Sequence, residues 1–313
     1  MKNVTLTMVS VLMTLCLCLP ARAETFGSGG DAFEIEFVTI GNPGNADDTS
    51  GNPNPAGKVD YGYRIGKYEI SEGMINKANA MGSLGIDHDD RGANKPATNI
   101  DWFEAAKFVN WLNTSTGNSA AYNFDGTGTF QLWQAADPGY NPNCLYRNSL
   151  AVYFLPSVDE WYKAAYYDPT GGGVYYDYPT GSNIEPMSVL SGTDSNTLVY
   201  DRSFSDGPAD INLAGGLSPY GTMGQGGNAG EWEESAFDLT NNLNTEYRAR
   251  HGSWADNTYS SSSSARTTQD PVIESSVLGF RVASVPEPST GLLSLLGLAG
   301  CILARSRRRS VRG

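Results

Sequence analysis

The stretch LPSVDEWYKAAYYDP, residues 155–169, contains the start, the middle and the end of one helix. Ser157 is placed as an N-cap, and Glu160 three residues later completes a capping box. The helix is expected to run through the Trp-Tyr-Lys-Ala-Ala segment. It should end before Pro169, because the residue that precedes a proline disfavours the helical conformation. The stretch therefore predicts a short helix with well-defined ends.

A second helix is expected over Trp102–Asn113, again with local signals at its start. Asp101 is the N-cap, and Glu104 closes a variant of the capping box. The apolar residues of this helix follow the i, i+3, i+4, i+7 spacing of a buried stripe. They are Ala105, Phe108, Val109 and Leu112.

The rest of the chain favours short strands and long loops. Residues 33–40 and 61–71 alternate apolar with polar side chains and predict strands. The 36 glycines and 16 prolines argue against a helical bundle or a coiled coil, and no internal repeat or linker is evident. Two main helices, short strands and long loops predict an irregular α+β fold in one domain, residues 24–284.

The first 23 residues have the pattern of a secretory signal peptide. Lys2 forms a weak basic region, an apolar run follows from Val4 to Leu19, and the segment closes on Ala21-Arg22-Ala23. A small residue on each side of the arginine fits a signal peptidase site. Glu24 is therefore expected to be the first residue of the mature protein.

Residues 285–313 form a second processing segment. Pro286-Glu287-Pro288 precedes a largely apolar run from Gly291 to Ala304, and five arginines follow it. The apolar run is marginal for crossing a hydrocarbon core of about 30 Å, and the arginines would stay in the cytoplasm. The three parts in this order resemble the PEP-CTERM sorting signal. A plain C-terminal anchor is the alternative interpretation.

The PEP-CTERM resemblance implies export and processing by signal peptidase and an exosortase-type peptidase. It further implies a location in the envelope, at the cell surface or in the extracellular matrix of a Gram-negative-type bacterium, often one that makes exopolysaccharide. Exopolysaccharide or a peptide is then the expected ligand.

Removing both terminal segments changes the charge balance. The whole chain has a net charge of −13 with 34 acidic and 21 basic side chains, and the body keeps 33 acidic and 14 basic side chains, a net of −19. Such acidity argues against a nucleic-acid partner, because phosphate binding needs a basic face. Cys144 is the one cysteine left in the body, so no internal disulfide can form.

Four blocks along the body resemble the sulfatase-modifying-factor family, whose best-known members are formylglycine-generating enzymes. Each block alone is weak, but their order and spacing are specific, and they span nearly the whole body. The resemblance implies a variant of the C-type-lectin fold. The blocks are KYEIS at 67–71, the segment 96–112, the segment 155–165, and a closing block of YG at 220–221, GNAGEW at 227–232, RHGSW at 250–254 and GFR at 279–281.

The family's oxidases carry two cysteines just after the R-G-G-S-W block, and these bind copper. In this chain Asp256 occupies the first position, and the second falls in the serine run Ser260 to Ser264. A serine hydroxyl cannot replace a thiolate as a ligand for soft Cu(I). We therefore expect no catalytic residue and no copper, with a ligand groove around Trp254, Asp256 and Arg266.

The resemblance also implies possible calcium ligands. Gly227, Ala229 and Glu231 match the family's calcium motif, while Gly224 stands where an Asn or Asp belongs. Asn196 and Asp210 are candidates for the family's second calcium site. The alternative interpretation of Glu231 is a structural carboxylate that accepts hydrogen bonds from loop amides.

Three functional hypotheses follow from the sequence. The first is a non-catalytic binding or structural module, because the scaffold is kept and the thiol pair is lost. The second is an enzyme of the family, either formylglycine-generating or one that uses other residues such as Asp256 and Glu231. The third is a scaffold held by calcium, which chelation would destabilise.

Overall fold

The computed structural model describes residues 22–240, 248 and 252–285. The predicted apolar run and arginines of the C-terminal segment, and most of the predicted signal peptide, lie outside the described residues. No helix within the described part of the chain is long and apolar enough to cross a membrane.

One five-stranded antiparallel sheet organises the fold, in the order β1-β2-β3-β13-β6. β1 and β2 form a hairpin, and β3 extends it on the other side of β2. β13 comes from the end of the body and pairs with both β3 and β6. The strands span Arg22–Phe26 (β1), Phe33–Ile40 (β2), Tyr63–Gly66 (β3), Tyr153–Phe154 (β6) and Ala283–Ser284 (β13).

The described residues contain three α-helices rather than the two main helices that we predicted. They are α1 (Glu72–Gly82), α2 (Trp102–Ser115) and α3 (Val158–Tyr166). Both predicted capping boxes are present, at the starts of α2 and α3. α1 was missed because its buried apolar residues are only Ile75 and Ala78, which is too few for a clear helical stripe. The α+β fold class is confirmed.

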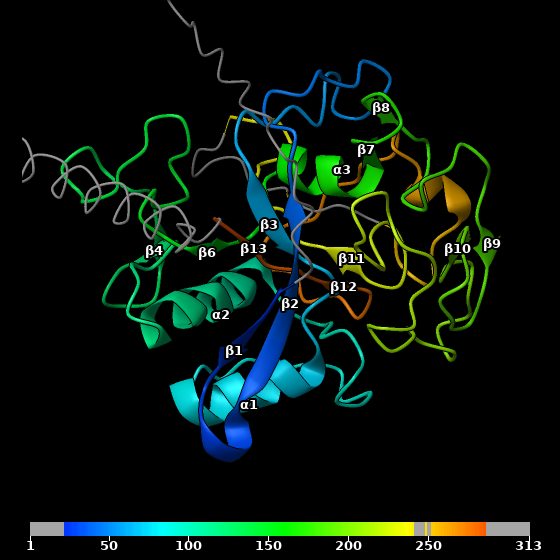
Figure 1. Ribbon diagram of the computed structural model, residues 1–313. Helices are drawn as coiled ribbons and strands as arrows, with labels where there is room; N and C mark the ends of the chain where they lie inside the picture. The colour runs from blue at the N-terminus through cyan, green and yellow to red at the C-terminus, as the bar shows by residue number, and fades with distance from the viewer. Residues whose placement is uncertain (1–21, 241–247, 249–251, 286–313) are drawn as a thin grey trace, which may run out of the picture.

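The remaining strands are two residues long and join loops in pairs. In Figure 1, α1 and α2 lie together at the lower left, and loops coloured from green to orange fill the right. We call the described residues of 169–282 the loop-built segment. The short pairs are β4 (Asn123–Phe124) with β5 (Phe130–Gln131), β7 (Tyr167–Asp168) with β8 (Val174–Tyr175), β9 (Met187–Ser188) with β10 (Thr197–Leu198), and β11 (Gly230–Glu231) with β12 (Leu278–Gly279). Two 3-10 turns complete the elements, η1 (Gly29–Asp31) and η2 (Thr258–Ser261).

The core lies where α2, the sheet and the loop-built segment meet. Phe108 of α2 packs against Phe33 of β2 with ring centres 6.3 Å apart, and against Phe280 at 5.5 Å. The predicted stripe of α2 is fully buried in this core. The packing joins the predicted helix to the G-F-R block of the closing segment.

The start of β1 contains the predicted cleavage site. Arg22 and Ala23 pair with Phe37 and Glu36 of β2. The Glu24 carboxylate accepts hydrogen bonds from the Arg64 guanidinium and from the Tyr153 hydroxyl. Cleavage after Ala23 remains a prediction.

Candidate functional site

Glu231 lies at the centre of a buried ion pair. Nε and Nη2 of Arg281 each donate to one oxygen of its carboxylate at 2.6 Å, and Trp161 Nε1 donates at 2.6 Å as well. Arg281 also donates to the carbonyl oxygens of Gly66 and Met223, both at 2.9 Å. This bidentate pair ties β11 to α3 and to the end of β3.

The predicted calcium ligands do not fit a calcium ion in this arrangement. Both oxygens of Glu231 already accept hydrogen bonds from protein groups. The Asp210 carboxylate pairs with Lys95 Nζ at 3.0 Å, and the Asn196 side-chain oxygen accepts from Thr180 at 2.9 Å. A hard cation needs several free oxygen ligands at one point. Calcium at Gly227, Ala229, Glu231, Asn196 and Asp210 would require these side chains to leave their present partners, and it stays an untested prediction.

Glu69, from the KYEIS block, lies beside this ion pair and is only 1% exposed. Asn228 donates to its Oε1 at 3.0 Å, while its Oε2 has no hydrogen-bond partner. Burial raises the pKa of Glu69 to about 7; Arg281 opposes the rise and Glu231 adds to it. Glu69 could not be recognised as a site residue from the sequence, because a single glutamate in a strand pattern gives no signal of its burial.

Gly224 is required by the close approach of the loop to Glu69. Its φ is +79°, and a Cβ at this position would lie 2.6 Å from Glu69 Oε1. This contact gives a physical reason for a glycine at the position where the family's calcium motif has an Asn or Asp.

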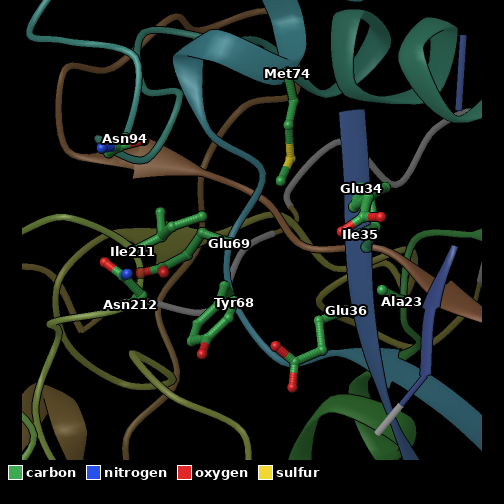
Figure 2. Close-up of a pocket in the computed structure, with 10 residues that line it drawn as sticks. All are labelled: Ala23, Glu34, Ile35, Glu36, Tyr68, Glu69, Met74, Asn94, Ile211 and Asn212. Carbon is green, nitrogen blue, oxygen red and sulfur yellow. The ribbon is translucent and has the colours of Figure 1, made fainter. Parts of the chain in front are cut away.

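Glu69 lines a pocket of about 280 Å³, which we call the Glu69 pocket and which is drawn in Figure 2. Strand β2 forms one wall with Glu34, Ile35 and Glu36, and Met74 of α1 lies above it. Tyr68 closes the bottom in this view, and the opposite wall comes from loop residues that include Ile211. The pocket therefore joins the first half of the body to the loop-built segment.

The groove that we predicted around Trp254, Asp256 and Arg266 requires a correction. Trp254 is fully buried, and the Arg91 guanidinium lies 4.7 Å from the centre of its ring. Arg266 is buried and pairs with Glu233 at 3.0 Å. Asp256 is half-buried, and its Oδ2 accepts from the backbone and the hydroxyl of Ser253. These side chains hold their own segment together and offer no open groove.

The same segment reaches a hollow through other residues. This pocket has a volume of about 390 Å³, and we call it the serine-loop pocket. It lies next to η2, drawn in orange in Figure 1. Tyr259 is 67% exposed at this site. The lining side chains are almost all polar, and they are Asp177, Tyr178, Asn183, Thr258, Tyr259, Ser262, Ser263 and Ser264.

Cys144 is held as a protonated thiol. Its Sγ donates to Glu234 Oε1 at 3.1 Å. Burial, and then the charge of Glu234, raise the pKa of this thiol to about 12. Only the thiolate ligates copper or acts as a nucleophile. The raised pKa leaves little thiolate at neutral pH, which disfavours both functions for the one cysteine of the body.

One group of three carboxylates converges among the described residues, and the sequence did not predict it. Asp101, Glu104 and Glu274 place one oxygen each within 4.8 Å of one another. Asp101 and Glu104 use their side chains in the capping box of α2. Burial raises the pKa of Glu104 to about 7. We interpret the group as helix capping with an acidic neighbour.

The comparisons with known proteins agree with this architecture. The family model of the sulfatase-modifying factor enzyme 1-like domain matches residues 37–285, and the PEP-CTERM protein-sorting motif matches residues 284–309. A search of the curated proteins gave no match.

Three solved structures share the fold at low identity. Treponema denticola variable protein 1 is 17% identical, with a TM-score of 0.56, over 84% of this chain and 99% of its own. CarF is 17% identical, with a TM-score of 0.52, over 81% of this chain and 99% of its own. PvdO from Pseudomonas aeruginosa is 15% identical, with a TM-score of 0.53, over 84% of this chain and 98% of its own. Identities this low establish the fold alone.

The sorting motif marks an exported bacterial protein of the cell surface or the extracellular space, processed by an exosortase-type enzyme. The match to the domain model covers most of the chain. The chain belongs to the sulfatase-modifying factor enzyme 1-like family and ends in a PEP-CTERM sorting signal.

Proposed function

We propose that this protein is a non-catalytic binding module at the cell surface or in the exopolysaccharide matrix. Its ligand is a neutral, polyhydroxylated molecule held in the serine-loop pocket. The observation that carries the proposal is the chemistry of the segment after Trp254. Where the oxidases of the family have a thiol pair, this chain has Asp256 and a run of serines that line a hollow.

The lining of the serine-loop pocket suits a sugar. Serine and threonine hydroxyls both donate and accept hydrogen bonds, and the Asp177 carboxylate accepts them. Tyr178 and Tyr259 add aromatic rings with polar ends, which can stack on the apolar face of a sugar ring. A few polar groups beside aromatic side chains are typical of small-molecule sites.

The walls of this pocket are fixed by hydrogen bonds within the protein. The backbone amide of Ser263 donates to the Asp177 carbonyl at 2.8 Å, and the amide of Asp177 donates to Asn183 Oδ1 at 2.9 Å. Thr258 Oγ1 donates to Glu185 Oε1 at 2.8 Å. A pre-formed site loses little conformational entropy when its ligand binds, which supports a binding role.

Two observations argue against catalysis by the family's chemistry. Cys144 stays protonated and lies far along the chain from the positions of the oxidase cysteines. Asp256 and Glu231, the carboxylates of the alternative enzyme hypothesis, both accept hydrogen bonds from neighbouring protein groups. Both oxygens of Glu231 are occupied by Arg281 and Trp161, and Oδ2 of Asp256 is occupied by Ser253, which disfavours a general-base role for either carboxylate.

A glycan and peptide array tests the proposal. The protein applied to the array is the exported form, purified from the producing cells. We expect binding to neutral glycans, reduced severalfold to about tenfold in Tyr259→Ala, because one stacked ring contributes about 0.5–1.5 kcal/mol. Phe204→Ala is the matched control, since Phe204 is 68% exposed and lies outside the pocket. Equal losses in both variants would contradict the site. Copper-dependent formation of formylglycine in a sulfatase-type peptide would contradict the absence of catalysis.

A further inference from the structure

The Glu69 pocket contains a carboxylate oxygen that lacks a partner. Glu69 is 1% exposed, Asn228 donates to its Oε1 at 3.0 Å, and its Oε2 has no partner. In Figure 2 its carboxylate points toward Ile211 and Asn212 on the loop side of the pocket. A buried polar atom without a partner costs free energy, and a donor in the pocket would remove that cost.

The charged groups around this oxygen leave a net negative pocket. Arg281 is committed to Glu231. On the strand side Lys67 Nζ pairs with Glu36 Oε1 at 2.9 Å, and on the loop side Lys95 pairs with Asp210. Glu34 and Glu69 are the lining carboxylates to which no ion pair is assigned among the described residues.

The rest of the lining suits a carbon skeleton. The lining also includes the apolar residues Ile35, Met74 and Ile211, and Tyr68 adds a ring. Asn94 and Asn212 add amide groups that can donate or accept. A volume of about 280 Å³ corresponds to roughly nine water molecules at about 30 Å³ each, which is room for a small organic molecule.

A divalent metal ion fits this pocket less well than an organic cation. Calcium takes six to eight oxygen ligands. Within the described residues, no group of three acidic, histidine or cysteine side chains converges at Glu69. A single free carboxylate oxygen beside apolar side chains instead matches an ammonium group on a carbon skeleton.

We propose that the Glu69 pocket binds a small organic cation whose primary ammonium group donates a hydrogen bond to Glu69 Oε2. The apolar side chains cover the carbon skeleton of the ligand, and Glu34 adds attraction at the exposed edge. This site shares no lining residue with the serine-loop pocket, so the proposal can be tested independently of the proposed function.

The ionisation of Glu69 gives the proposal a second, independent readout. Burial raises the pKa of Glu69 to about 7. The ammonium pairs with the ionised carboxylate, so the affinity should rise with pH. Because the ionised fraction changes about tenfold between pH 6 and pH 8, the affinity should change by about the same factor. The affinity of a ligand that makes no contact with the Glu69 carboxylate would not change with pH in this way.

Calorimetric titration of the exported protein tests the site with two classes of primary amine. One arm uses 1,4-diaminobutane, with 1,4-butanediol as the uncharged match. The other uses cyclohexylamine, with cyclohexanol as its match, because the ammonium group of an alkylamine stays protonated from pH 6 to pH 8. We expect one amine to bind with the predicted pH profile and its neutral match to bind at least tenfold more weakly. If neither amine binds, or if the neutral matches bind equally well, the proposal is overturned.

Variants separate the carboxylate from the pocket. Glu69→Gln keeps an acceptor for Asn228, and it should weaken amine binding at least tenfold at pH 8 and remove the pH profile. Glu34→Gln, at the exposed edge of the same pocket, should weaken it only two- to threefold. If Glu69→Gln fails to fold, Met74→Trp serves instead, because it fills the pocket from α1 and should abolish binding. An amine that binds either the folded Glu69→Gln protein or the Met74→Trp protein unchanged would contradict the assignment.

Discussion

Two parts of this molecule are stabilised by different interactions. The sheet, α1 and α2 share one large apolar core, with the stripe of α2 fully buried. The loop-built segment has a small apolar cluster of its own, formed by Val199, Ala209 and Trp254. Buried ion pairs, Arg281 with Glu231 and Arg266 with Glu233, hold its chain in place. Where the elements are too short to form a stripe, buried ion pairs thus add to apolar burial, to which Trp232 and Phe280 of this segment also contribute.

The largest expected effect comes from breaking the central ion pair of the loop-built segment. Arg281→Ala leaves the buried Glu231 carboxylate without its main partner, and it should lower the free energy of unfolding by about 3–5 kcal/mol. Urea denaturation followed by tryptophan fluorescence measures this value. A loss below about 1 kcal/mol would show that the ion pair does not hold the segment.

A substitution in the apolar core shared by the sheet and α2 measures the contribution of apolar burial, for comparison with the ion pair. Leu112→Ala removes a fully buried side chain of α2 and should cost about 3 kcal/mol, from lost burial and a new cavity. Leu150→Ala is the control, because Leu150 is 56% exposed and should change stability by at most about 0.5 kcal/mol. Similar losses in both variants would show that burial in the apolar core does not determine this cost.

The buried carboxyl group of Glu69 should make the stability of the protein depend on pH. The pKa of Glu69 is about 7 in the folded protein, above its ordinary value of 4.5. The folded state therefore binds the proton more tightly than the unfolded state, and the contribution of Glu69 to stability falls as the pH rises from about 4.5 to 7. The slope is at most about 1.4 kcal/mol per pH unit. Glu69→Gln should flatten this part of the profile, and an unchanged profile would contradict the assigned pKa.

The smallest expected effect concerns calcium. Saturating chelator should leave the melting temperature unchanged, because Glu231 already has protein donors at both oxygens. Differential scanning calorimetry with and without chelator measures this. A clear decrease in the melting temperature would mean that calcium displaces Arg281 and would restore the calcium-scaffold hypothesis.

The sequence predicted the elements whose signals are local. Asp101 with Glu104 and Ser157 with Glu160 are capping boxes within three residues, and both are present in the structure. α1 lacks a comparable stripe, although Ser71 does act as its N-cap and accepts from the Met74 amide. Capping residues therefore locate the start of a helix well, but a helix without a clear apolar stripe is still missed.

The candidate sites could not be predicted in the same way, because they depend on contacts between distant residues. Glu231 and Arg281 were both within recognised blocks, but their pairing across 50 positions leaves no periodic signal. The Glu69 pocket combines β2, α1 and the loop-built segment. Trp254 and Arg266 were expected at a groove and are buried, since sequence position alone does not reveal which side of a loop faces the solvent.

The position of β13 sets an order of events for a protein that is made from its N-terminus. Arg64 of β3 donates to the carbonyl of Val285, which lies 221 positions later. Until residues 283–284 are available, β3 and β6 have no strand between them, so the sheet closes only when the body is complete. The sorting motif begins at residue 284, within that same strand. A chain truncated before this point would lose its sorting motif and the strand between β3 and β6 together.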